Sequence, residues 1–431
     1  MGTGPFMGCD PYILAALRTP RGKGSSKGAL HGIAPTALVA HLLEALRPSL
    51  SDGVHVDDFI LGCANPTGEQ AGNLARSALL AIAWPGDVPG LMVNRYCTSG
   101  LDAIAIAGSR VRAEDASLVI AGGVESVSRV AAPAMLGDIG PAADLIATIE
   151  GIEREACDEY AHATRTKAKA APIGASIVRF GASTSIASST ATSTASSTAS
   201  STTSSTASST ASSTASSTAS STASSTATLA GDENISFQPT VDELAAMPAL
   251  FASEAFAEPN ARSAAWLRAR GRDAELRHVH TRGNSPSLAD AAALVLVGDG
   301  EAARRIGMAP RARIVATASV AADPVVMLTA GQAAVERVLE KANVRSADIA
   351  VFEFAEAFAA SCVRFMRALD VGHDRFNPNG GTIARGHAYG ATGAALVVDA
   401  LEELERREGR YAVVGVSGAA GMGAAMLIER V

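Results

Sequence analysis

Short apolar runs along this chain alternate with longer stretches in which apolar residues recur at helical spacing. The alternation fills the first 130 residues and returns after residue 285. It is typical of βαβ units, in which a largely parallel sheet carries helices on both faces. We therefore predict an α/β segment at each end of the chain. The predicted strands are 12–16, 59–62, 91–96, 118–123, 289–297, 312–317, 349–354 and 411–416, and the predicted helices include 35–46, 73–83, 332–342, 357–369 and 392–406.

Each α/β segment contains a reactive residue in a turn that precedes a helix of small residues. In the first segment, the apolar run 91–96 predicts a buried strand, Cys97 follows it, and Thr98 opens the helical stretch. In the second segment, His387 lies in a glycine-rich turn before the helix predicted at 392–406. Two segments with the same organisation indicate an ancient duplication.

The region between the two segments has a different character. Residues 131–284 are helical and irregular, and within them residues 182–228 are almost wholly Ala, Ser and Thr in a repeat close to ASST. Side chains this small cannot offset the entropy of ordering, so the repeat is predicted to be disordered or loosely structured and to carry no chemistry. We predict an N-terminal half at 1–130, a loop domain at 131–284 and a C-terminal half at 285–431.

Cys97 occupies a position that suits a nucleophile. The unpaired N–H groups and the dipole of a helix start favour the thiolate over the thiol, and the same N–H groups can receive an oxyanion during acyl transfer. The alternative is that Cys97 is a small buried core residue, which is the commoner role of a free thiol.

Three further turns are candidates for the same site. His387 lies among glycines that let backbone approach a ligand closely, so it is either a base or oxyanion donor, or an ordinary exposed loop histidine. Glu356, in the stretch FEFAEAFAA at 352–360, is either a site residue or only a charge at a helix start. The stretch VSGAAGMGAAMLIE at 416–429 is a glycine-rich turn after a strand and is suited to placing backbone N–H groups around an anionic oxygen.

Composition and charge exclude several classes of protein. The chain has 431 residues, of which 48% are hydrophobic and 18% charged, and a net charge of -7, so it has no general attraction to nucleic acid. Its five cysteines are scattered and predict neither a zinc site nor a disulfide framework, which fits a reducing compartment. No apolar run approaches the roughly 20 residues that cross a bilayer. We predict a cytoplasmic protein without a membrane partner.

The motifs resemble those of the thiolase family, which comprises acetyl-CoA acetyltransferases and 3-ketoacyl-CoA thiolases. The resemblance covers nearly the whole chain apart from the repeat, and it is specific because many matches occur in order. The matching motifs are RTPRGK (18–23), VNRYCTSGLDAIAIA (93–107), AGGVESVSR (121–129), GIEREACDEYA (151–161), TRGNSPSLADAAALV (281–295), FEFAEAF (352–358), NPNGGTIARGHAYGATGA (377–394) and the closing turn VSGAAGMG (416–423).

The resemblance implies a five-layered α-β-α-β-α fold of two similar halves with an inserted loop domain. It implies that Cys97 takes the acyl group as a thioester and that His387 activates it and helps to hold the thioester oxygen. It further implies that Ser285, Ala357 and Phe358 contact coenzyme A, which is a substrate, and that no metal or redox cofactor is needed. Members of the family are dimers or tetramers.

The chain also departs from the family's pattern. Ala355 stands where thiolases have the Asn or His that orients a water in an oxyanion hole, and Ser417 stands where they have the second cysteine, an acid and base. A serine hydroxyl is hard to deprotonate near neutral pH, whereas a thiol of pKa about 8.5 can be tuned into range. Ala388 replaces the proline of Gly-His-Pro, and Pro286 and Ser287 alter the turn near the pantetheine.

Two interpretations follow from these residues. The first is an acyl-CoA acyltransferase of lipid metabolism that performs thiolytic cleavage of 3-ketoacyl-CoA, or the reverse Claisen condensation, through acyl-Cys97. The second is a thiolase-like protein with impaired catalysis that binds acyl-CoA, or a slow acyl-CoA thioesterase. Loss of an oxyanion donor costs about 10²–10³ in rate and loss of a positioned acid or base about 10²–10⁴, so the two departures together can remove useful turnover.

Overall fold

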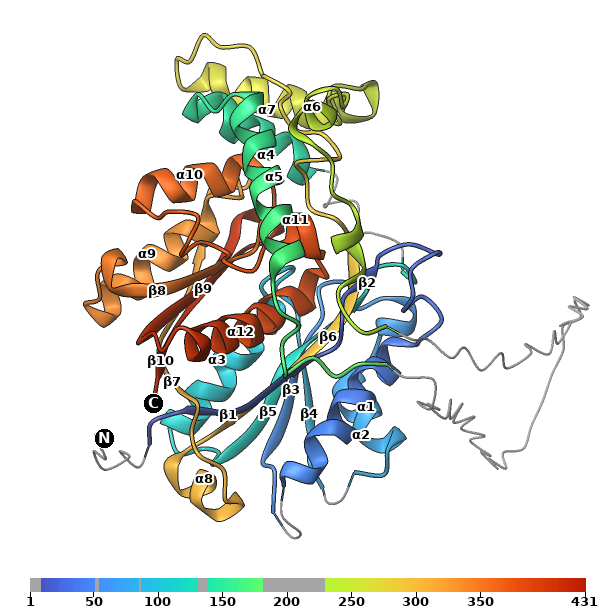
Figure 1. Ribbon diagram of the computed structural model, residues 1–431, viewed down its shortest axis with the longest axis vertical. Coiled ribbons are helices and arrows are strands. Elements are labelled where there is room, and N and C mark those ends of the chain that lie inside the picture. Colours follow the sequence, from blue (N-terminus) through green and yellow to red (C-terminus); the bar gives the residue numbers. More distant parts are fainter. Residues whose placement is uncertain (1–8, 51–53, 85–86, 131–137, 181–228) are drawn as a thin grey trace, which may run out of the picture.

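The computed structural model of the protein describes residues 9–50, 54–84, 87–130, 138–180 and 229–431 (Figure 1). The strands are β1 (Tyr12–Arg18), β2 (Gly22–Lys23), β3 (Asp58–Gly62), β4 (Gly90–Val93), β5 (Leu118–Ser126), β6 (Ala289–Gly298), β7 (Ala312–Ala321), β8 (Ile349–Phe354), β9 (Tyr411–Ser417) and β10 (Met422–Arg430). The helices are α1 (Pro35–Leu46), α2 (Leu74–Ala81), α3 (Ser99–Arg112), α4 (Ile139–Glu150), α5 (Arg154–Ala170), α6 (Val241–Ala245), α7 (Ala257–Ala269), α8 (Gly300–Ile306), α9 (Ala330–Ala342), α10 (Ala359–Leu369), α11 (Thr382–Arg385) and α12 (Tyr389–Arg406). The strands and helices predicted from apolar spacing are all present, with ends that differ by a few residues.

Among the described residues, hydrogen bonding joins the strands in the order β4-β3-β5-β6-β1-β7-β10-β9-β8, with β2 beside β6. Only β3 with β4, β3 with β5 and β8 with β9 run parallel, and the other neighbouring pairs are antiparallel. The prediction of a largely parallel sheet is therefore wrong. Parallel neighbours need a crossover helix, whereas β9 and β10 are joined by a short turn and β6 returns to β5 after the long excursion of residues 127–288.

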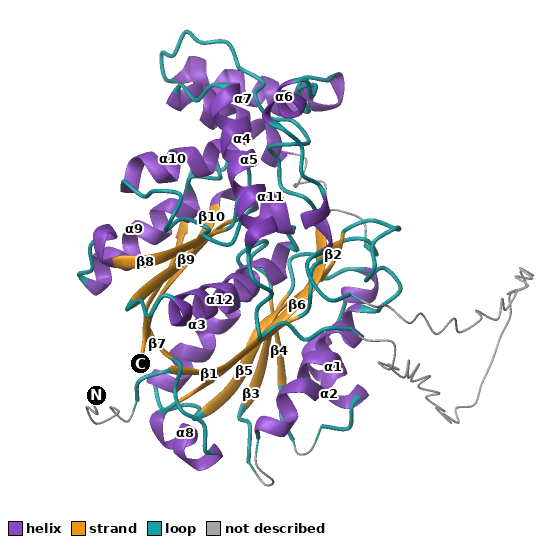
Figure 2. Ribbon diagram, viewed as in Figure 1, coloured by secondary structure: helices purple, strands orange, loops and turns teal. Residues whose placement is uncertain are grey.

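The layers alternate between helices and sheet (Figure 2). Helices α3 and α12 lie in the middle and share one apolar core with residues of β1, β5, β6, β9 and β10. Helices α1 and α2 cover the outer face of the β3, β5 and β6 part, and α9 and α10 cover the outer face of the β8, β9 and β10 part. This is the five-layered α-β-α-β-α arrangement that the resemblance implies.

The helices of the loop region gather at one end of the molecule, where α4, α5, α6 and α7 lie above the layered body (Figure 1). Strand β6 follows this region in sequence, yet it pairs with β5 and β1, which belong to the first 130 residues. We keep 131–284 as a proposed loop domain. The pairing of β6 is an argument for starting the C-terminal half after residue 298 rather than at 285.

Strand β4, which leads to Cys97, differs from its prediction. It was expected to be a buried strand ending at residue 96, but it ends at Val93 and lies at the edge of the sheet, with Leu91 42% exposed. An edge strand has a neighbour on one side only, so apolar character alone does not show that a strand is buried on every side.

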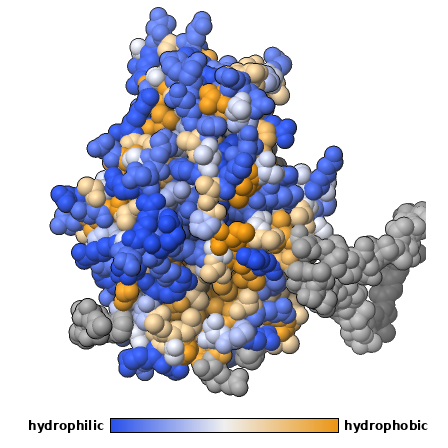
Figure 3. All heavy atoms as spheres, in the orientation of Figure 1, coloured by the Kyte–Doolittle hydropathy of each residue, from blue (hydrophilic) through white to orange (hydrophobic). Residues whose placement is uncertain are grey.

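The surface in view is mainly hydrophilic, with apolar side chains in smaller groups (Figure 3). No helix in the described part of the chain is both long and apolar enough to span a membrane.

The predicted disorder of the repeat falls on residues 182–228, which lie outside the described residues. The described residues on either side of it are close together. Phe180 and Leu229 form an antiparallel bridge, with N–H to O distances between heavy atoms of 3.3 and 3.1 Å. The Phe180 ring is buried and stacks on His41 with ring centroids 4.2 Å apart. The chain therefore leaves and re-enters the body at one place.

Because the two ends already pair, we expect that replacing residues 181–228 by a four-residue Gly-Asn-Gly-Ser linker leaves the Tm within about 3 °C of the native value, since hairpin loops of two to five residues join such strands. Phe180→Ala, which removes the stacked ring but keeps the repeat, should lower the Tm by about 5 °C. Differential scanning calorimetry on both variants measures the effect. A larger loss for the linker variant than for Phe180→Ala would contradict the prediction.

Candidate active site

The site forms where the first turns of α3 and α12 touch. A Cβ placed on Gly100 would lie 2.5 Å from the Gly390 carbonyl oxygen, and one on Gly390 would lie 2.5 Å from the Ala64 nitrogen. Only glycine permits backbones to approach this closely. Because Cys97 shortly precedes α3 and His387 shortly precedes α12, the glycine contact brings these two candidate residues to one place.

Cys97 is a buried residue in the central core, 3% exposed. Burial raises the pKa of its thiol to about 12, and the nearby Glu125 adds to the rise. Backbone hydrogen bonds from Ala419 and from Cys97 itself act in the opposite direction. A Cβ on Gly418 would lie 3.5 Å from Thr98 Cγ2, so the 417–421 turn packs directly against the cysteine turn.

The expectation that the helix start favours the Cys97 thiolate stays a prediction. Two N–H groups face the sulfur, as the position before α3 led us to expect, while desolvation in the core acts against them and raises the pKa of the thiol. The N–H groups are suited to negative charge that develops on a bound acyl group.

His387 is also buried, and burial lowers the pKa of its imidazole to about 4, with the Arg21 charge adding to the shift. Its Nδ1 lies 2.9 Å from Thr392 Oγ1. Its backbone is held as well, because the His387 N–H donates to Ser287 O at 2.6 Å and the Ala289 N–H donates to His387 O at 3.1 Å. The alternative of an exposed loop histidine is excluded, and burial favours the neutral form of the imidazole.

Two residues near this pair were not identified from the sequence. The Tyr389 ring meets the His387 ring edge to face, with centroids 5.5 Å apart, and burial together with the Cys97 and Glu125 charges raises the pKa of its hydroxyl. Glu125, at the end of β5, accepts hydrogen bonds from Gly390 N at 2.9 Å and Ala64 N at 2.8 Å. Glu125 lies in the AGGVESVSR motif, but no local pattern shows that its carboxylate points inward.

Ser417 ends β9 and lies next to the turn that carries Ala419. Its hydroxyl donates to Leu328 O at 2.7 Å and accepts from Gly331 N at 3.0 Å, so it joins β9 to the start of α9. No hydrogen bond within the described residues joins Ser417 to Cys97 or His387. Its contacts are those of a structural link.

Ala355 is fully buried, and its side chain brings no polar group to the site. The neighbouring Glu356 is a buried link rather than a charge at a helix start. Its carboxylate accepts from Tyr160 Oη at 2.6 Å, Thr164 Oγ1 at 2.7 Å and Ile383 N at 2.8 Å. Glu356 thus joins α5 to α11 at Ile383, four residues before His387. These contacts correct the interpretation of Glu356 as only a charge at a helix start.

The three residues expected to contact coenzyme A come together. Ala359 N donates to Asn284 O at 3.1 Å, which places the Ala357 and Phe358 segment beside Ser285. Ser285 is 6% exposed, and its hydroxyl has no hydrogen-bond partner in the described structure.

Phe358 packs edge to face on His280, with ring centroids 5.2 Å apart.

No group of three or more His, Cys, Asp or Glu side chains in the described parts of the chain is arranged to hold a metal ion.

Fold and site together define a class: a layered α/β protein in which a buried cysteine and a buried histidine each lie just before one of two central helices whose first turns touch. Comparison with known proteins gives the family. Residues 11–138 match the N-terminal domain of thiolase and residues 308–430 match its C-terminal domain. The chain belongs to the thiolase family.

Similar proteins extend over almost the entire chain. The beta-ketoadipyl-CoA thiolase of Escherichia coli is 34% identical and the alignment covers 98% of this chain and 100% of that protein. The 3-ketoacyl-CoA thiolase of Bacillus subtilis (strain 168) is 30% identical, with 97% and 99% covered. The crystal structure of the Bacillus anthracis acetyl-CoA acetyltransferase is similar with a TM-score of 0.77 and 25% identity, covering 99% of this chain and 100% of that one.

Since only the thiolate reacts, iodoacetamide alkylation of Cys97 in the free protein should rise about tenfold for each pH unit between pH 7 and 10, well below its pKa of about 12. Quantitative mass spectrometry of the peptide that contains Cys97 follows the rate. In urea, where burial is lost, the same plot should level off near pH 9. A native rate that is flat across this range would show that Cys97 is already a thiolate.

Proposed function

We propose that the protein is an acyl-CoA acyltransferase of thiolase type, which cleaves 3-ketoacyl-CoA with coenzyme A or runs the reverse Claisen condensation through acyl-Cys97. The observation that carries the proposal is the sulfur of Cys97, which faces the N–H groups of Ala419 and Cys97. Tyr389 lies between Cys97 and His387, since its ring contacts the His387 ring and its hydroxyl is influenced by Cys97. Substrate names among the relatives, beta-ketoadipyl-CoA and 3-ketoacyl-CoA, support a 3-ketoacyl thioester as the class.

Each residue has a defined task in this scheme. His387 takes the proton of the Cys97 thiol as the sulfur attacks the 3-keto carbon, and the two N–H groups hold the oxyanion. The bond between C2 and C3 then breaks, the acyl group stays on sulfur, and the released carbanion of acetyl-CoA takes the proton that His387 carries. Coenzyme A thiol finally attacks the carbonyl of acyl-Cys97, the thioester bond to Cys97 breaks, and the proton of coenzyme A passes to the released Cys97 sulfur.

A groove in the loop region is the observation that supports coenzyme A binding. An apolar groove of about 490 Å³ is lined by Phe237, Met247, Pro248, Ala249, Leu250 and Arg282. Arg282 lies three residues before Ser285, whose buried hydroxyl lacks a partner in the described structure and is suited to a pantetheine amide. We propose that Ser285, Ala357 and Phe358 line the arm and that Arg282 lies toward its charged end.

One observation favours the second function, a protein with impaired catalysis that binds acyl-CoA or hydrolyses it slowly. The Ser417 hydroxyl is already engaged by Leu328 O and Gly331 N. A hydroxyl that donates to a backbone carbonyl is not free to protonate the C2 carbanion, and Ala355 offers no amide in its place. The two candidates share acylation of Cys97 and differ in the step that consumes coenzyme A.

A homodimer or homotetramer is part of the proposal. The outer side of the edge strand β4 is a surface on which a second copy can pair, since strand edges present free backbone groups. Light scattering after size exclusion separates the two states from a monomer. Our placement of the protein in the cytoplasm stays a prediction, and it rests on five cysteines that are all free thiols.

Incubation with acetyl-CoA is expected to add one acetyl group to the native protein and none to Cys97→Ala, because the sulfur is the acceptor. Intact-mass spectrometry reads the adduct directly. The matched control is Cys63→Ala, which removes another buried thiol that contacts Glu125 and leaves Cys97 in place. An adduct that persists in Cys97→Ala would place the nucleophile elsewhere.

Ser417→Cys, alone or with Ala355→Asn, should raise thiolysis of acetoacetyl-CoA by about tenfold or more, because a thiol can be tuned to serve as acid and base. Acylation of Cys97 should change less. The control is Ser417→Ala, which loses the same two backbone hydrogen bonds without gaining a thiol. Normal acylation without faster thiolysis in the double variant would mean that these two groups do not limit the reaction.

A further inference from the structure

Five charged side chains form a buried network behind the His387 turn. Asp232 accepts from Arg18 Nη1 at 2.8 Å, Arg21 Nη1 at 3.0 Å and Arg385 Nε at 2.7 Å. Asp399 accepts from Arg18 Nε at 2.9 Å and Arg21 Nη2 at 2.7 Å, with Arg385 Nη1 farther away at 3.7 Å. All five residues are less than a tenth exposed.

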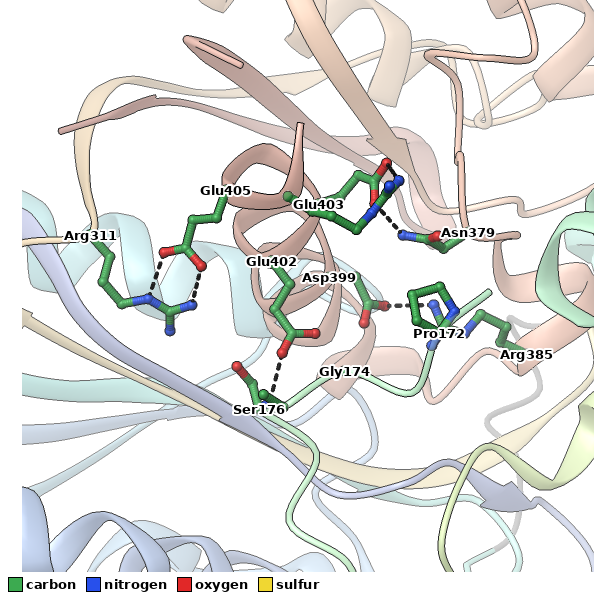
Figure 4. A pocket seen from close by; sticks show the side chains of 12 residues that line it. Pro172, Gly174, Ser176, Arg311, Asn379, Arg385, Asp399, Glu402, Glu403 and Glu405 are labelled. Atoms are coloured by element: carbon green, nitrogen blue, oxygen red, sulfur yellow. Dashed lines mark hydrogen bonds and ion pairs between the residues drawn. The ribbon is translucent and has the colours of Figure 1, made fainter. Parts of the chain in front are cut away.

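The network joins parts of the chain that are far apart in sequence. Arg18 ends β1 and Arg21 follows it, Asp232 comes from the proposed loop domain, Arg385 ends α11, and Asp399 lies on α12. Arg385 and Asp399 face each other beside a surface pocket of about 340 Å³ (Figure 4). The carboxylate of the loop region is therefore bound to both halves of the layered body.

Among the three arginines of the network, Arg385 is the nearest in sequence to the proposed base. A single residue, Gly386, separates it from His387, and Gly386 has a φ of 116°, where a side chain would be strained. A Cβ there would also lie 2.7 Å from Ala289 Cβ and 2.8 Å from Asn234 Nδ2. The short, constrained peptide transmits the position of Arg385 to His387.

Burial makes the network sensitive to charge balance, because an unpaired buried charge is costly. Removing Arg385 leaves two arginines, Arg18 and Arg21, with two aspartates, and both remaining arginines still contact both carboxylates. Removing Arg18 leaves Arg21 and Arg385 with the same two aspartates. The two deletions are therefore matched in net charge and remove an arginine from the same two carboxylates. Arg18 makes four side-chain hydrogen bonds and Arg385 one, so Arg18→Gln is the more disruptive control.

We propose that Arg385 is a positioning residue for His387: anchored on Asp232 of the loop region, it holds the Arg385-Gly386-His387 peptide so that the imidazole reaches the Cys97 thiol. The inference rests on the proposed function, in which His387 takes the proton of Cys97. The inference adds that acylation depends on the position of the loop region against the layered body, because Asp232 of that region binds Arg385. A misplacement of about 1 Å at a reacting group can cost about a hundredfold in rate.

The test compares Arg385→Gln with the matched Arg18→Gln in the full chain. Acylation of Cys97 is followed by mass spectrometry of samples that are acid-quenched at successive times, over a range of acetyl-CoA concentrations. We expect Arg385→Gln to lower the limiting rate about 10-fold to 100-fold relative to Arg18→Gln, with the half-saturating concentration within about threefold. Arg385→Lys keeps the charge and one contact, so it should recover part of the rate.

A second readout does not depend on acyl chemistry. In protein carrying ¹³C-labelled histidine, the His387 resonance, assigned with His387→Gln, should move in Arg385→Gln and stay in place in Arg18→Gln. Equal limiting rates or equal resonance shifts in the two variants would overturn the positioning role. Should Arg385→Gln not fold, the comparison of Arg385→Lys with Arg18→Lys decides in the same way.

The two proposals fail differently. A native protein that forms no acetyl adduct contradicts the proposed function, and the His387 resonance still decides whether Arg385 positions the imidazole. A native protein that is acylated, with Arg385→Gln no slower than Arg18→Gln, overturns the positioning role alone.

Discussion

The contact of bare backbone between the first turns of α3 and α12 is the constraint on which the site depends. Gly100 meets the Gly390 carbonyl at a distance that excludes any side chain, and Gly393 packs equally closely on Leu101. Helices that approach this closely fix the positions of their starts, and the two reactive residues lie just before those starts. Gly100, Gly390 and Gly393 thus have a structural purpose, since larger side chains would push the two helices apart.

Burial then decides the chemistry that the pair can perform. The same core that holds the helices together removes water from Cys97 and His387, which raises the pKa of the thiol and lowers that of the imidazole. Both shifts disfavour charge on the two side chains. Glu125 reinforces this state, because its carboxylate opposes a second negative charge nearby.

Charged and polar links attach the surrounding segments to this centre. Glu356 joins α5 to α11, and the network around Asp232 joins the loop region to β1 and α12. Buried ion pairs contribute little net stability but fix one arrangement among alternatives, because a shifted segment would leave charges unpaired. The Ser417 hydroxyl makes a similar link between β9 and the start of α9.

The sequence by itself determined the local elements, the two reactive turns and the family. Apolar spacing placed α1 and β8 at their observed bounds, and the ordered motifs indicated the roles of Cys97 and His387. Only the tertiary structure decided that most neighbouring strands are antiparallel, that β4 is an edge strand, and that Cys97 lies in a core that raises the pKa of its thiol. The reason is physical: helix and strand formation depend on neighbours in sequence, whereas strand direction, desolvation and the partners of Ser417 and Arg385 depend on residues tens to hundreds of positions away.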